Sequence, residues 1–174
     1  MQCHSNKIGI TMSGMISLQD AANQFFSYKR IAVAGVSRTK KDAANLIYTT
    51  LRGRGYQVFA INPHAERIEG DPCYRSLADI PGGAEAVVIA LAPEKTKQIA
   101  YEAMEAGLKA VWMHKSFGDS VSEDAAKVCR EKGMLVIPGG CPMMFSKPVD
   151  FGHLCIREVL TMIGRIPKKI STVP

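Results

Sequence analysis

Five short apolar runs alternate with longer segments of helical period along this 174-residue chain, and this alternation constrains the fold more than any other feature. Each run is rich in β-branched residues and is bounded by Gly, Pro or Asn, which is typical of a strand buried on both faces. The five runs are Arg30–Gly35, Tyr56–Asn62, Glu85–Leu91, Lys109–His114 and Met134–Gly139.

The segments between the runs predict helices, because their apolar residues recur at helical spacing and glycines stand at their ends. These segments cover 41–55, 93–107 and 120–133, with a leading helix over 17–28 and a trailing one over 150–164. The order of strands and helices predicts a Rossmann-like, doubly wound α/β fold, with a mostly parallel five-stranded sheet and helices on both faces. We expect residues 1–15 to form a flexible N-terminal tail and residues 16–174 to form a single domain.

The composition fits a cytoplasmic protein, since 47% of the residues are hydrophobic, 22% are charged and the mean hydropathy is near zero. No apolar run reaches the ~20 residues of a membrane span, so we expect no membrane partner. The five cysteines are widely spaced and contain no CxxC motif, which predicts neither a disulfide framework nor a metal site. The net charge of +6 favours an anionic partner, but dispersed basic residues and few aromatics argue against nucleic acid.

The turn after the first run carries the residues most suited to an anion. Ligands of an open parallel sheet bind beyond the carboxyl ends of the strands, where the strand order reverses. This turn reads GVSRTKK, so Gly35, Ser37, Arg38 and Lys40 stand just before a predicted helix. Free backbone amides, the positive end of the helix dipole and the three cations Arg38, Lys40 and Lys41 together predict a phosphate site.

The same region departs from the pattern of NAD-binding folds. Those folds carry GxGxxG in this turn and an acidic residue at the end of the second strand. This chain instead has Asn62 and Pro63 at the end of the second run, with His64 and Arg67 just beyond. Cations in place of a carboxylate favour a phosphorylated adenosine, either coenzyme A with its 3′-phosphate or NADP with its 2′-phosphate.

From about Arg30 to Phe145 the chain resembles the small, stand-alone coenzyme A binding proteins, and is similar to the N-terminal CoA-binding domain of the succinyl-CoA synthetase α subunit. The resemblance rests on VAGVSRTKKDAAN, GYQVFAINP, EGDPCYRSLADIP and GLKAVWMHKSFGDSVSEDAAKVCREKGMLVIPGGCPM. It implies that the ligand is coenzyme A or an acyl-CoA.

The resemblance also implies which residues contact the ligand. The phosphates would be wrapped by Gly35, Val36, Ser37 and Arg38, and Asn45 would support this loop from the first helix. Asn62 and Pro63 would border the adenosine. The adenine slot would be lined by Leu91, Ala92 and Pro93. Two positions depart from the family's pattern. His114 stands where the family usually has Gln, and Gly139-Gly140 stands where it has a polar or basic pair, both on the path of the pantetheine arm.

Two residues at strand ends carry side chains capable of chemistry. His114 could be a general base, a pyrophosphate contact or a hydrogen-bonded histidine without function, and Cys141 a nucleophile or an inert thiol. The sequence contains no Ser/His/Asp arrangement, HExxH motif or Walker loop, so we expect no catalytic residue. Three functions remain open: a non-catalytic CoA or acyl-CoA module acting as carrier, sensor or regulatory partner, an NADP-dependent reductase, and a protein-interaction domain with a vestigial pocket.

The trailing amphipathic segment carries Phe151, Leu154, Val159 and Met162 on what could be one stripe. Such a stripe predicts a helix that covers the sheet. The alternative is a contact with a second copy of the chain or with a protein partner.

Overall fold

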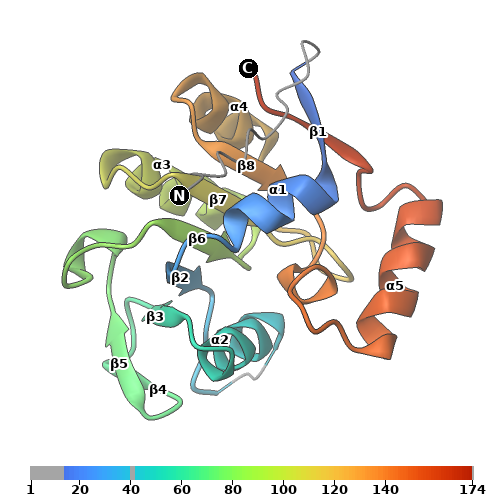
Figure 1. Cartoon of the computed structure of the whole chain (residues 1–174). Coiled ribbons are helices and arrows are strands. Elements are labelled where there is room, and N and C mark those ends of the chain that lie inside the picture. Colours follow the sequence, from blue (N-terminus) through green and yellow to red (C-terminus); the bar gives the residue numbers. More distant parts are fainter. Residues whose placement is uncertain (1–13, 40–41, 174) are drawn as a thin grey trace, which may run out of the picture.

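The apolar runs form the parallel centre of one sheet. The computed structural model describes residues 14–39 and 42–173, and the central strands are β2 (Arg30–Ala34), β3 (Gln57–Ile61), β6 (Ala86–Ile89), β7 (Ala110–Met113) and β8 (Leu135–Pro138). They pair in parallel in the order β3-β2-β6-β7-β8 (Figure 1). The mostly parallel, doubly wound sheet predicted from the sequence is therefore confirmed.

Over the described residues the sheet has seven strands, which corrects the predicted count of five. Strand β5 (Asp71–Tyr74) pairs in parallel with β3, and β4 (Arg67–Ile68) pairs antiparallel with β5 at the edge. Both strands are short, Gly70 lies in the turn between them and Pro72 lies within β5, so they lack the continuous apolar run that marks the central strands. The hairpin of β4 and β5 brings a second set of polar residues to the carboxyl edge of the sheet.

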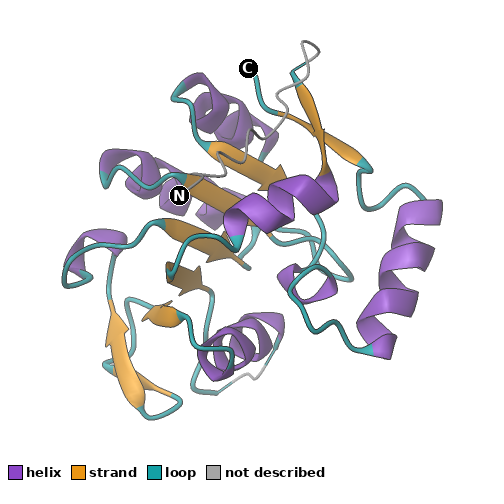
Figure 2. Ribbon diagram, viewed as in Figure 1, coloured by secondary structure: helices purple, strands orange, loops and turns teal. Residues whose placement is uncertain are grey.

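Helices cover both faces of the sheet (Figure 2). Helices α1 (Leu18–Phe25) and α2 (Ala43–Gly53) pack on one face, and α3 (Pro93–Glu105) and α4 (Glu123–Glu131) on the other. Two 3-10 turns, η1 (Leu77–Asp79) and η2 (Pro142–Met144), complete the two layers. Because side chains alternate along a strand, Ile31 and Val33 of β2 contact the first layer and Ala32 and Ala34 the second.

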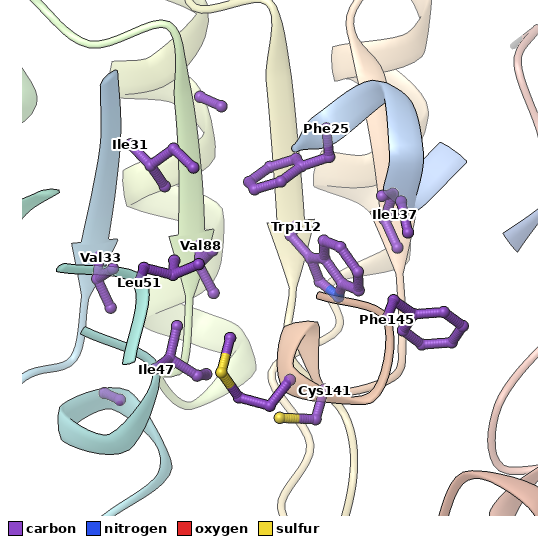
Figure 3. Close-up of a cluster of buried hydrophobic side chains, with 14 of the residues drawn as sticks. Phe25, Ile31, Val33, Ile47, Leu51, Val88, Trp112, Ile137, Cys141 and Phe145 are labelled. Carbon is purple, nitrogen blue, oxygen red and sulfur yellow. The ribbon is translucent and has the colours of Figure 1, made fainter. Parts of the chain in front are cut away.

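Trp112 is the centre of the larger core and fixes the turn after β8. Its ring is fully buried, and the centroid of the Phe25 ring lies 5.2 Å away at an edge-on angle (Figure 3). The indole N–H donates to the backbone oxygens of Gly139 (3.0 Å) and Gly140 (3.1 Å). The core therefore determines the position of the β8 carboxyl end, from which Cys141 follows.

Helix α5 (Phe151–Met162) does not cover the sheet, so the interpretation of its apolar stripe as a cover is wrong. In Figure 1 the helix lies beside the sheet, and its contacts are mainly with η2. Phe151, Val159 and Met162 are 81%, 56% and 85% exposed, whereas Leu160 is buried. The helix packs against the core through the opposite side from the predicted stripe.

Strand β1 (Met15–Ser17) pairs antiparallel with β9 (Lys169–Ser171) and joins the two ends of the described chain. The predicted tail, residues 1–15, lies outside the described residues except for Gly14 and Met15, and Met15 already belongs to β1. Across the described ranges, no helix is both long enough and apolar enough to cross a bilayer.

Candidate functional site

The strand order reverses between β2 and β6, and the loops that leave these two strands touch. The chain runs from β2 outward to β3 and the hairpin, then returns to the other side of β2 as β6. Gly35, which follows β2, has a φ of +112°, and a Cβ built on it would lie 2.4 Å from the backbone oxygen of Ala90. Only glycine fits this position, because any side chain would overlap the β6 loop.

The loop after β2 is held by Asn45 from the first turn of α2. The Asn45 side chain is buried; its Oδ1 accepts from the Ser37 backbone N–H (3.0 Å) and its Nδ2 donates to the Ser37 backbone oxygen (2.9 Å). The same Nδ2 lies 3.2 Å from Oε1 of Glu69, in the turn between β4 and β5. Asn45 therefore joins the loop, the helix and the hairpin.

Asn62 makes the equivalent connection from the end of β3. Its Nδ2 donates to the backbone oxygen of Val36 (2.8 Å), and its Oδ1 accepts from the backbone N–H of His64 (2.9 Å). The Val36 side chain is buried in the core, so only the backbone of this residue belongs to the site. Arg38 reaches across to the His64 backbone oxygen at 3.4 Å. The loops after β2 and β3 thus form one connected wall.

These loops and the hairpin enclose a depression of about 860 Å³, which we call the arginine pocket. The residues that line it are Arg38, Pro63, His64, Ala65, Glu66, Arg67, Cys73 and Arg75. Three guanidinium groups and one imidazole face a single carboxylate, so the pocket attracts anions. Guanidinium is also the side-chain group best suited to holding phosphate through paired hydrogen bonds.

Arg75 lines the arginine pocket but is not among the residues predicted from the sequence. Within the described residues, its side chain makes no hydrogen bond or ion pair. It directly follows β5, and because β5 runs parallel to β3, its carboxyl end lies at the same edge of the sheet. Recognising DPCY as a parallel strand would have placed Arg75 in the site.

The start of α2 differs from the predicted open anion site. Asp42 is the N-cap, and its Oδ1 accepts from the Ala44 backbone N–H at 3.1 Å. A carboxylate therefore already occupies the positive end of the helix dipole. The predicted ligand residue Lys40 lies outside the described residues, whereas Arg38 is described and lines the arginine pocket.

The residues after β6 are adjacent to the loop after β2 but do not line the arginine pocket. Ala92 is the N-cap of α3 and Pro93 its first helical residue, as the sequence pattern predicts. The Cδ2 atom of Leu91 lies 3.4 Å from the position of a Cβ on Gly35. The structure therefore brings Leu91 against the loop after β2 at the point where the strand order reverses.

His114 and Cys141 lie further along the carboxyl edge, at the ends of β7 and β8. Both are buried, and Nε2 of His114 lies 3.2 Å from the Ser116 hydroxyl. Burial lowers the pKa of His114, and a weaker effect of Asp42 opposes this shift. Burial raises the pKa of the Cys141 thiol to about 11, so it is protonated at neutral pH.

Comparison with known proteins identifies similar chains. An α subunit of ADP-forming acetate–CoA ligase II from Pyrococcus furiosus is 27% identical over 125 residues, which cover 67% of this chain but only 27% of that protein. The uncharacterized protein YneT of Bacillus subtilis is 27% identical over 113 residues, or 65% of this chain and 82% of that one. A solved structure of a hypothetical protein from Pyrococcus horikoshii has a TM-score of 0.69 and 29% identity, covering 75% of this chain and 90% of that one.

A family model described as CoA binding domain matches residues 29–147. The match includes β2 to β8, the loops that Asn45 and Asn62 hold, and every residue of the arginine pocket. This chain therefore belongs to the CoA binding domain family.

Proposed function

We propose that this chain is a cytoplasmic, non-catalytic module that binds coenzyme A or an acyl-CoA at the carboxyl edge of its sheet. The observation that carries the proposal is the arginine pocket, which three arginines line beside a loop held by a buried asparagine. Membership of the CoA binding domain family selects coenzyme A among the phosphorylated adenosines that such a pocket suits.

The geometry supports one direction for the ligand. The arginine pocket, beyond β3 and β5, suits the 3′-phosphate, and the loop from Val36 to Arg38 suits the diphosphate. From β3 to β8 the edge crosses four strand spacings, roughly 19 Å, which is enough to support an extended pantetheine arm. The arm would then pass His114 toward Cys141.

The state of Cys141 supports a binding role without chemistry. A nucleophilic or disulfide-exchanging cysteine reacts as the thiolate, which requires a pKa near or below the ambient pH. The pKa of Cys141 is about 11, and the cause is burial. A protonated, buried thiol suits a module that holds coenzyme A as a carrier, a sensor or a regulatory partner.

The test is a titration of the purified protein with coenzyme A and with dephospho-CoA, which lacks the 3′-phosphate. Arg75→Ala should weaken coenzyme A about tenfold to a hundredfold, because a hydrogen bond to a charged group contributes about 1.5–3 kcal/mol. The same variant should bind dephospho-CoA about as the unchanged protein does. Lys132→Ala, which removes one positive charge at the C-cap of α4, is the matched control and should bind coenzyme A normally.

Two results would contradict the proposal at different levels. An equal loss for both ligands in Arg75→Ala would remove this residue from the 3′-phosphate site. A folded, nucleotide-free protein that binds neither coenzyme A nor acetyl-CoA would reject the function itself.

A further inference from the structure

His114 stands at the carboxyl end of β7 and has one ring nitrogen without a hydrogen-bond partner in the described part of the chain. The residue is 4% exposed and follows β7 directly. Its Nε2 lies 3.2 Å from the Ser116 hydroxyl, and within the described residues Nδ1 has no hydrogen-bond partner. This nitrogen is not fully enclosed by protein atoms of the described residues, so it borders open space. A buried polar atom without a hydrogen-bond partner in the protein is suited to contact a ligand.

The groups around His114 combine burial with one nearby negative charge. Asp42 faces it from the start of α2, and in its own loop Lys115 pairs with Asp119 at 2.8 Å. The neighbouring strand end contributes Cys141, a neutral thiol. Burial holds the pKa of His114 below its usual value, so the imidazole is neutral at neutral pH in the unliganded protein.

The position of His114 along the edge relates it to the central part of the ligand. Strand β7 lies two strands from β2, so its carboxyl end lies roughly 10 Å from the start of the loop after β2. A diphosphate on that loop would add negative charge between β2 and β7. Nearby negative charge favours the protonated form of an imidazole.

We propose that His114 contacts the diphosphate–pantetheine part of the ligand through its open ring nitrogen and takes up a proton when the ligand binds. This inference rests on the proposed function and adds a pH dependence to it. Because the complex holds the proton more tightly than the free protein, affinity increases as the pH falls through the pKa of the complex. The affinity stops increasing once the pH is below the pKa of His114 in the free protein, which is lower than its pKa in the complex.

The experiment uses dephospho-CoA, because the second pKa of a phosphate monoester, near 6, would add a proton uptake of its own. Calorimetry in two buffers of different ionisation enthalpy gives the number of protons taken up. The unchanged protein should take up a fraction of a proton, and its affinity should fall about threefold to tenfold between pH 6 and pH 8. His114→Gln keeps a polar side chain that cannot titrate, so it should show neither effect.

His153→Gln is the matched control, since His153 lies on α5 and outside the arginine pocket. It should retain the proton uptake with dephospho-CoA. Uptake that persists in His114→Gln, or a pH-independent affinity of the unchanged protein, would overturn the inference while leaving coenzyme A binding intact. Absence of binding to both dephospho-CoA and coenzyme A would reject the proposed function itself.

Discussion

Gly35 and Asn45 determine the shape of the loop on which the proposed site depends. Gly35 permits the loop after β2 to contact the β6 loop, and Asn45 fixes both backbone polar groups of Ser37. Neither residue needs to touch a ligand to affect binding. The loop is pre-formed by these contacts, so less conformational freedom is lost when an anion binds.

Replacing Gly35 tests the contact with the β6 loop. Gly35→Ala should lower the free energy of unfolding by about 2 to 5 kcal/mol, because it adds backbone strain and an overlap with Ala90. Gly55→Ala is the matched control, since Gly55 has a φ of +83° and nothing within 4 Å of its Cβ position. This control should lower the free energy of unfolding by about 1 to 2 kcal/mol, because it adds backbone strain without the overlap. Equal losses in urea unfolding would show that the overlap is relieved without cost.

Most residues of the connected wall could be predicted from the sequence, because they lie next to the long apolar strands. Gly35, Ser37, Asn62 and His64 follow β2 or β3 within a few residues. Arg75 and Glu69 could not be predicted in the same way, because their place in the site depends on β5 pairing with β3. That pairing joins segments whose short, Pro-containing sequence predicts a loop.

The hairpin of β4 and β5 is attached to α2 by a small polar cluster. The Tyr48 hydroxyl donates to Oδ2 of Asp71 (2.7 Å), and Arg52 forms an ion pair with the same carboxylate. Both partners lower the pKa of Asp71. Because Arg67 and Arg75 flank this hairpin, the cluster helps to fix one wall of the arginine pocket.

Asp71→Asn tests this attachment through its pH dependence. A carboxyl whose pKa is lowered in the folded protein contributes stability above its unfolded pKa, about 3.9, and loses it as the pH falls through the folded value. The variant should therefore be less stable than the unchanged protein at pH 7, and the two should converge toward pH 2. Chemical denaturation across this range measures the difference, and a constant difference would show that the Asp71 charge contributes nothing.

At the scale of the molecule, α5 leaves an apolar stripe exposed. Phe151, Cys155, Val159 and Met162 lie at helical spacing on the side away from the core. The midpoint of the stripe is near Arg157, so an antiparallel pair about a two-fold axis would place Phe151 of one copy against Met162 of the other.

We predict that the chain self-associates through this stripe. Val159→Glu should shift the protein toward the monomer in sedimentation equilibrium, because each copy would bury an unpaired carboxylate in the apolar interface. Tyr101→Glu, which places the same charge at an exposed aromatic position on α3, is the control and should leave the association unchanged. A protein that is monomeric at every concentration measured would refute the prediction.

Coenzyme A binding is the central claim, and the most direct measurement is a calorimetric titration of nucleotide-free protein with coenzyme A, NADP and NAD side by side. The pocket of three guanidinium groups and the family membership predict micromolar binding of coenzyme A. NADP and NAD should bind at least about tenfold more weakly, a difference of about 1.4 kcal/mol. Tighter binding of NADP than of coenzyme A would contradict the account and favour a reductase.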